Sequence, residues 1–145
     1  MTLVTESVAV VIRRADGAFL VTRRPDEAGD PLAGVWGFPA VTRRPGEDER
    51  SAAARIGPLK LGVTLSVGAK LGERTDDRGD YLLRLADYAA VIADGSPAVP
   101  QADESVTQYV ACTFTDDPGL LVPAAERGSL CSQIFLESIG VDWLR

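Results

Sequence analysis

Two pairs of adjacent arginines, Arg23-Arg24 and Arg43-Arg44, are the groups of this sequence best suited to hold a small anion. A guanidinium can bind a phosphate or carboxylate through two parallel hydrogen bonds, so these pairs predict contact with a small anionic metabolite. The sequence has no histidine, which excludes Ser-His and Cys-His catalysis and histidine-ligated metals.

The net charge of −6 is unevenly distributed along the chain. Residues 1–60 carry nine basic and eight acidic side chains, whereas residues 61–145 carry six basic and thirteen acidic ones. Affinity for duplex nucleic acid rests on neutralising phosphates with basic side chains. An acidic chain without a long basic run therefore predicts no duplex nucleic-acid partner.

The composition is that of an ordinary globular domain, with 46% hydrophobic and 25% charged residues. A chain of this length can bury a sizeable core, and we expect a single domain over residues 1–145. No apolar run approaches the ~20 residues that span a bilayer, and the first residues lack the pattern of a signal peptide. We therefore expect a cytoplasmic protein without membrane contact. Cys112 and Cys131 are too far apart for a zinc-ligand pair, and we expect two buried, reduced thiols.

The amino-terminal half must position the arginine pairs. Residues 7–14 alternate and are rich in valine, and residues 18–24 follow after an Asp-Gly turn, so the two segments predict a hairpin of strands. Residues 25–34 have the Pro, Gly and Asp content of a loop, and residues 35–41 form a short extended piece. A helix is expected from Glu47 to about Ile56, with acidic residues at its positive amino end.

The carboxy-terminal half predicts strands and one further helix. Gly57-Pro58 should end or kink the first helix, because proline lacks an amide donor and disfavours helical angles at the preceding residue. The spacing of apolar residues predicts a helix over residues 124–140. The order of elements predicts an α/β domain in which helices pack on one mixed sheet. The expected strands cover residues 62–74 with a bend, 81–93 and 106–115.

The stretches LVTRRP, LAGVWGFPA, PGE, AAAR and LGV, all within residues 19–63, resemble the Nudix hydrolase family. The family signature places a glycine, five residues, a glutamate, seven residues, Arg-Glu, an aliphatic residue, one residue, Glu-Glu, one residue, and glycine plus an aliphatic. Its spacing fits without insertion, with matches at Glu47, Arg55, Gly62 and Val63. The resemblance in layout covers nearly the whole chain and implies a Nudix-type α/β/α sandwich with a mixed sheet between helices.

Most carboxylates of that signature are replaced in this chain. The first glycine falls at Val41, the glutamate after the arginine at Ile56, and the Glu-Glu pair at Leu59 and Lys60. In the family, such glutamates share one helical face and hold Mg²⁺ against a diphosphate that water attacks. Here two acids are apolar and one is a cation, which repels Mg²⁺. The resemblance therefore implies the fold, while the substitutions predict loss of Mg²⁺-dependent hydrolysis and no cofactor.

Other charged residues are candidates for a rebuilt site. Asp103 and Glu104 lie in a loop where many Nudix enzymes carry an extra catalytic carboxylate; with Glu47 they would form the catalytic and Mg²⁺-binding set of a divergent hydrolase. Arg55 matches an arginine that orients a glutamate in the family, and we expect it to pair with Glu47 or a distant acid. Lys60 places a cation at the former ion site, where it either neutralises a ligand anion without metal or is an exposed surface lysine.

Three functions stay open at this point. The first is a Nudix scaffold that binds, or performs metal-free chemistry on, a small nucleotide-like or phosphorylated metabolite. The second is a divergent hydrolase of a nucleoside-diphosphate-linked compound. The third is a non-catalytic interaction subunit whose pocket is filled by Ile56 and Leu59, which we expect to be at least partly buried. Many Nudix proteins are dimers, so the resemblance also raises a homodimer. The ligand-binding candidates of the first function are Arg23, Arg24, Arg43, Arg44, Arg55 and Lys60.

Overall fold

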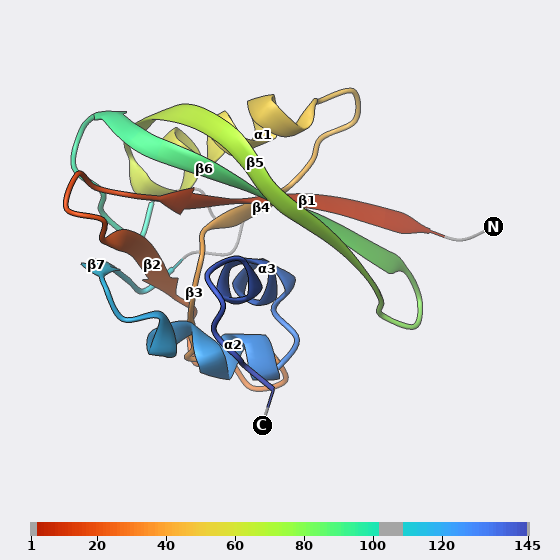
Figure 1. Ribbon diagram of the computed structural model, residues 1–145. Coiled ribbons are helices and arrows are strands. Elements are labelled where there is room, and N and C mark those ends of the chain that lie inside the picture. Colours follow the sequence, from red (N-terminus) through yellow and green to blue (C-terminus); the bar gives the residue numbers. More distant parts are fainter. Residues whose placement is uncertain (1–2, 102–108, 145) are drawn as a thin grey trace.

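A four-stranded mixed sheet is the largest element of the computed structural model, which describes residues 3–101 and 109–144 (Figure 1). The second strand in this sheet, β1 (Val4–Ile12), pairs in parallel with β6 (Leu82–Asp94) and antiparallel with β4 (Ala40–Thr42). β5 (Thr64–Asp77) and β6 form a long antiparallel hairpin whose register shifts between Val67 and Gly72, which confirms the predicted bend. In order across the sheet, the strands are β4, β1, β6 and β5.

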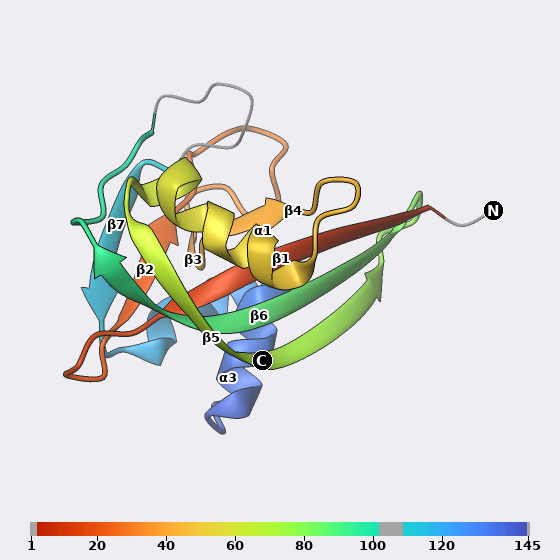
Figure 2. The ribbon, with the colours of Figure 1, turned by 90° about the horizontal axis from the view of Figure 1, so that it is seen from above.

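Helices cover both faces of this sheet and bury a separate apolar core on each (Figures 1 and 2). Successive side chains of a strand point to opposite faces, so Val10 packs under α1 (Glu49–Ile56) and Val11 packs under α3 (Leu130–Ser138). The arrangement confirms the predicted α/β/α sandwich with a mixed sheet between helices. No helix in the described ranges is long and apolar enough to cross a membrane.

A second, three-stranded sheet makes the prediction of a single sheet wrong. β2 (Phe19–Arg23) lies between β3 (Trp36–Gly37) and β7 (Ala111–Thr115). The predicted hairpin of the first two strands is reduced to one isolated bridge. This bridge joins Arg13 and Phe19 across the Asp-Gly turn. β6 pairs with β1 along its whole length and β4 pairs with Ser7–Ala9, while β2 pairs with β3 and β7 in the second sheet.

The first helix begins later than predicted. The carboxylate of Asp48 accepts a hydrogen bond from the amide of Ser51 at 2.7 Å and caps α1. Glu47 therefore precedes the helix instead of forming its first turn. Its side chain pairs instead with Arg55 of the same helix.

The same helix changes its winding at Gly57-Pro58. The α-helix ends at Ile56, as predicted, but the chain continues in a π-helical turn, η1 (Gly57–Leu61), before Gly62 adopts the left-handed conformation. Pro58 has no amide proton for the α-helical ladder, which favours this change. Gly57 is also required by packing, because a Cβ there would lie 2.6 Å from the carbonyl oxygen of Val63.

The predicted helix over residues 124–140 is broken in two. α2 (Val122–Glu126), preceded by the short turn η2 (Pro118–Leu121), ends before Gly128, whose φ of +101° is left-handed. Glycine adopts this angle readily, so the chain turns there and restarts as α3. Gln133 of α3 then donates to the carbonyl of Ala125 at 3.0 Å, which fixes the two helices to each other.

Candidate functional site

Glu47 is fully engaged by its own protein. Arg55 donates from Nε to Oε2 at 2.9 Å and from Nη2 to Oε1 at 3.0 Å, and the amide of Arg44 donates to Oε1 at 3.0 Å. The two paired side chains are only 14% and 16% exposed. The hydrogen bonds from Arg55 are the largest cause that lowers the pKa of Glu47 to about 2. The predicted pairing of Arg55 with Glu47 is confirmed, and this carboxylate serves the junction between the loop and α1.

Arg43 and Arg55 are both held by protein groups around this junction. Arg43 donates from Nε and Nη2 to the carbonyl oxygen of Glu47, at 2.9 and 2.7 Å, and from Nη1 to the Glu6 carboxylate of β1. Arg55 also donates to the carbonyl oxygen of Thr42 at 2.9 Å. These two arginines therefore join β1, β4 and α1. Arg44, in contrast, is exposed.

The helix positions that match the glutamates of the Nudix signature are largely buried. Ile56 is 0% exposed in the core under α1, and Leu59 is half-buried against the same core, which confirms the predicted burial of both. Within residues 3–101 and 109–144, no three acidic or cysteine side chains gather as ligands for a metal ion. The two loop candidates Asp103 and Glu104 lie outside the described residues.

Lys60 points inward, so the alternative of an exposed surface lysine is wrong. Lys60 is 6% exposed, and its Nζ lies 5.4 Å from the centre of the Tyr109 ring. The reason is the π-helical turn η1, which buries Gly57, Lys60 and Leu61 together. A cation over an aromatic face is stabilised by the ring quadrupole, and this offsets part of the cost of burial.

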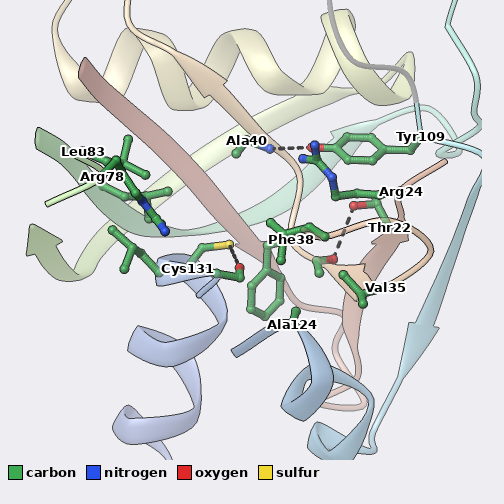
Figure 3. A pocket seen from close by; sticks show the side chains of 15 residues that line it. Thr22, Arg24, Val35, Phe38, Ala40, Arg78, Leu83, Tyr109, Ala124 and Cys131 are labelled. Carbon is green, nitrogen blue, oxygen red and sulfur yellow. Dashed lines mark hydrogen bonds between the residues drawn. The ribbon is translucent and has the colours of Figure 1, made fainter. Parts of the chain in front are cut away.

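A cavity of about 130 Å³ lies on the opposite face of the sheet, beside α2 and α3 (Figure 3). Engineered apolar cavities of ~150 Å³ hold a benzene molecule, so this one can accept a single ring. Its wall is mostly apolar, with Phe38, Leu83, Leu85 and Leu130 among the lining residues. Phe38 packs against Phe19 and Phe135 as well as lining the cavity.

The uncharged polar groups of the cavity wall are hydrogen-bonded to the protein. The hydroxyl of Thr22 donates to the carbonyl of Gly37 at 3.3 Å, and the hydroxyl of Tyr109 accepts from the amide of Ala40 at 3.0 Å. Burial raises the pKa of Tyr109 to about 12 and the pKa of Cys131 to about 11. Both groups therefore stay protonated near neutral pH, where a thiol is a poor nucleophile.

The charged lining residues within the described ranges are two arginines, Arg24 and Arg78. Arg24 donates from Nε and Nη2 to one oxygen of Asp30, at 3.1 and 2.9 Å. Its neighbour Arg23 is exposed, donates to the carbonyl of Gly34 at 3.1 Å, and does not line the cavity. The structure thus separates the predicted ligand-binding residues, and Arg24 is the one that reaches the cavity.

Arg78 and Tyr109 were missed by sequence reasoning. Arg78 lies in the turn between β5 and β6, which has the composition of a solvated hairpin tip, and nothing in its spacing indicates that it folds back to α2 and α3. Tyr109 lies in a segment predicted to be a strand, where an aromatic residue is ordinary. No local sequence signal marks either as part of a cavity.

No family model matches the sequence, and no curated protein sequence matches it either. Solved structures do match the fold. The NUDIX hydrolase from Nitrosomonas europaea aligns with a TM-score of 0.72 and 17% identity, over 93% of this chain and 87% of that one. The chain has a Nudix fold.

Two further structures share the Nudix fold of this chain along nearly their whole lengths. The E. coli ORF135 protein aligns with a TM-score of 0.71 and 24% identity, over 96% of this chain and 93% of that one. An Ap4A hydrolase from C. elegans aligns with a TM-score of 0.64 and 15% identity, over 93% and 97%. α1 and η1 lie within the stretch that resembles the Nudix signature, and the cavity lies on the opposite face of the sheet.

Proposed function

We propose that this chain binds a small nucleotide-like or phosphorylated metabolite on its Nudix fold and does not hydrolyse it with Mg²⁺. The observation that carries the proposal is the state of the signature residues. Glu47 is bound by Arg55 and by the amide of Arg44, while Ile56 is fully buried in the core. A ring-sized cavity with an arginine in its wall lies on the other face of the sheet.

The metal side of the proposal rests on ligand supply. Mg²⁺ requires near-octahedral oxygen ligands and is held by carboxylates together with substrate phosphates. Glu47 already accepts three hydrogen bonds, so a metal ion there would compete with the Arg55 guanidinium, whose side chain is 16% exposed, for the same carboxylate. Removing one partner from a poorly exposed ion pair is costly. The fold therefore favours the ion pair over a metal ion at this position.

The ligand side of the proposal rests on the cavity. Its apolar wall suits the face of a heterocyclic ring, and Arg24 offers hydrogen-bond donors that Asp30 does not use. The presence of a cavity favours ligand binding over the interaction-subunit alternative, in which the ligand pocket is filled. The divergent-hydrolase alternative draws on the similarity to structures named as hydrolases.

Metal-independent ligand binding is the expected result of a thermal-shift screen. The panel contains nucleoside mono-, di- and triphosphates and sugar phosphates, each with millimolar Mg²⁺ and with EDTA. A ligand at a hundredfold excess over Kd stabilises the native state by ~2.7 kcal/mol, so a binder raises Tm clearly. We expect the same rise in Mg²⁺ and in EDTA, and little effect of Mg²⁺ alone.

Two variants separate the alternatives in this screen. Glu47→Gln removes the charge of the remaining signature glutamate, and Glu49→Gln removes an acid two residues away that pairs with Lys70. A rise in Tm that needs Mg²⁺ and disappears in Glu47→Gln but not in Glu49→Gln would support the divergent hydrolase. Absence of any stabilising compound would leave the interaction subunit as the better account.

A further inference from the structure

We propose that the cavity selects a compact ring bearing one carboxylate or phosphate group, and that Arg78 holds this anionic group. The inference rests on the proposed function, in that the ligand is a small anion. It further specifies the end of the cavity that the anionic group occupies and the residue that selects an anionic over a neutral ligand. Arg78 is outside the Nudix signature and outside the arginine pairs.

Arg78 closes one end of the cavity from the tip of the β5–β6 hairpin. Its Nη2 donates to the carbonyl oxygen of Gly128 at 2.8 Å, across the turn between α2 and α3. Gly128 is left-handed, and a Cβ at this position would approach Nη1 of Arg78 to 3.2 Å. A glycine at 128 thus serves the turn and leaves room for the guanidinium.

The two cavity arginines differ in how far their charge is neutralised. Arg24 directs Nε and Nη2 at Asp30, whose side chain is 19% exposed, and the ion pair is 2.9 Å long. Arg78 has an uncharged carbonyl as its hydrogen-bond acceptor, and its acidic partner Asp76 is 3.4 Å away with a side chain 49% exposed. A solvent-exposed pair is weak, so Arg78 presents the stronger uncompensated charge to the cavity.

The position of the two arginines fixes the orientation of the ligand. Figure 3 shows Arg24 and Arg78 on opposite sides of the cavity, with Phe38 and Cys131 between them. One small anionic group therefore contacts one arginine or the other, not both. Lys60 is not a lining residue, since its ammonium lies over the Tyr109 ring. Because Arg78 carries the less compensated charge, a ring resting on Phe38 is expected to direct its anion to Arg78.

The test uses three ring compounds of matched size: phenyl phosphate, benzoate and the neutral benzamide. Their affinities are measured by NMR titration on the wild type, Arg78→Gln, Arg78→Lys and Arg127→Gln. Arg127 is the matched control, because it donates to the carbonyl oxygen of Ala33 at 3.2 Å yet does not line the cavity. Phenyl phosphate and benzoate distinguish the two possible anions.

We expect at least one anion to bind the wild type more tightly than benzamide does. Arg78→Gln should weaken that anion roughly ten- to a hundredfold, as for the loss of one charge-assisted hydrogen bond. Arg78→Lys should lose less, because it keeps the charge without the planar fork, and Arg127→Gln should change nothing. If Arg78→Gln fails to fold, Arg78→Lys and the comparison of anion with benzamide still decide the question.

Three results would overturn the assignment. The wild type could bind the anions and benzamide with equal affinity, it could bind none of the probes, or the Arg78 variants could bind the anions as tightly as the wild type does. Failure of the assignment is distinguishable from failure of the proposed function. A nucleotide or sugar phosphate that binds equally well in EDTA to the wild type and to Arg78→Gln would preserve the proposed function and reject the role of Arg78.

Discussion

Replacing Asp87 by asparagine is expected to stabilise the protein at pH 8 and to lose this advantage toward pH 4. Asp87 lies in β6, is 0% exposed, and neither of its carboxylate oxygens has a hydrogen-bond partner within the described structure. Its register neighbours are Ala9 in β1 and Gly72 in β5, so the carboxyl group sits between two small residues beneath α3. A buried charge without a partner is strongly disfavoured, so the folded state holds this group protonated.

The direction of the pH dependence follows from the difference between folded and unfolded states. Burial raises the pKa of Asp87 well above its ordinary value, whereas in the unfolded chain it titrates near ~3.9. Above that pH the unfolded state releases the proton and the folded state retains it. The free energy of unfolding therefore falls as pH rises from ~3.9 until the folded group also ionises. Asparagine does not titrate and removes this loss.

Urea unfolding of both proteins between about pH 4 and pH 8 measures the effect. The gain of Asp87→Asn at pH 8 should be about 1.4 kcal/mol for each pH unit over which the folded state keeps a proton that the unfolded state has released. Asp94→Asn, an exposed position at the end of the same strand, should match the wild type throughout. Parallel stability curves for the wild type and Asp87→Asn would show that Asp87 is not held protonated by burial.

Truncation of Ile56 should have the largest effect among the former signature positions. Ile56→Ala removes a fully buried side chain from the core under α1 and should lower the free energy of unfolding by ~2–5 kcal/mol. Ile56→Glu, which restores the residue of the family signature, should destabilise at least as much, because it buries an unpaired carboxylate. Leu59→Ala, at a half-buried position, should cost less.

Denaturant unfolding of these three variants, with and without Mg²⁺, provides the measurement. An Ile56→Glu protein that is as stable as the wild type and gains further stability from millimolar Mg²⁺ would contradict the account. It would mean that position 56 can face an ion site.

Much of the fold could be predicted from the sequence. The valine alternation of β1, the signature spacing from Glu47 to Val63, and the long apolar strand β6 all correspond to elements of the structure. The division into two sheets could not be predicted, because it depends on which distant strands pair with β1 and which pair with β2. The pairing of strands that are distant in the sequence depends on tertiary packing.

The candidate site was less predictable than the fold. The sequence left Arg55 with two possible partners, Glu47 or a distant acid, and the structure pairs it with Glu47. The inward position of Lys60 depends on a π-helical turn that neither proline nor glycine specifies alone, and the role of Arg78 depends on a hairpin tip folding onto Gly128. The contact between Arg78 and Gly128 joins residues 50 positions apart, and no local pattern encodes it.

The most direct test of the central claim is an assay of phosphate and pyrophosphate release. Nucleoside di- and triphosphates and dinucleoside polyphosphates are incubated with the wild type and with Glu47→Gln, in Mg²⁺ or Mn²⁺ and in EDTA. We predict that release by the wild type in the presence of metal equals that of Glu47→Gln and of the EDTA control. Metal-dependent release by the wild type that Glu47→Gln abolishes would contradict the account and establish a divergent hydrolase.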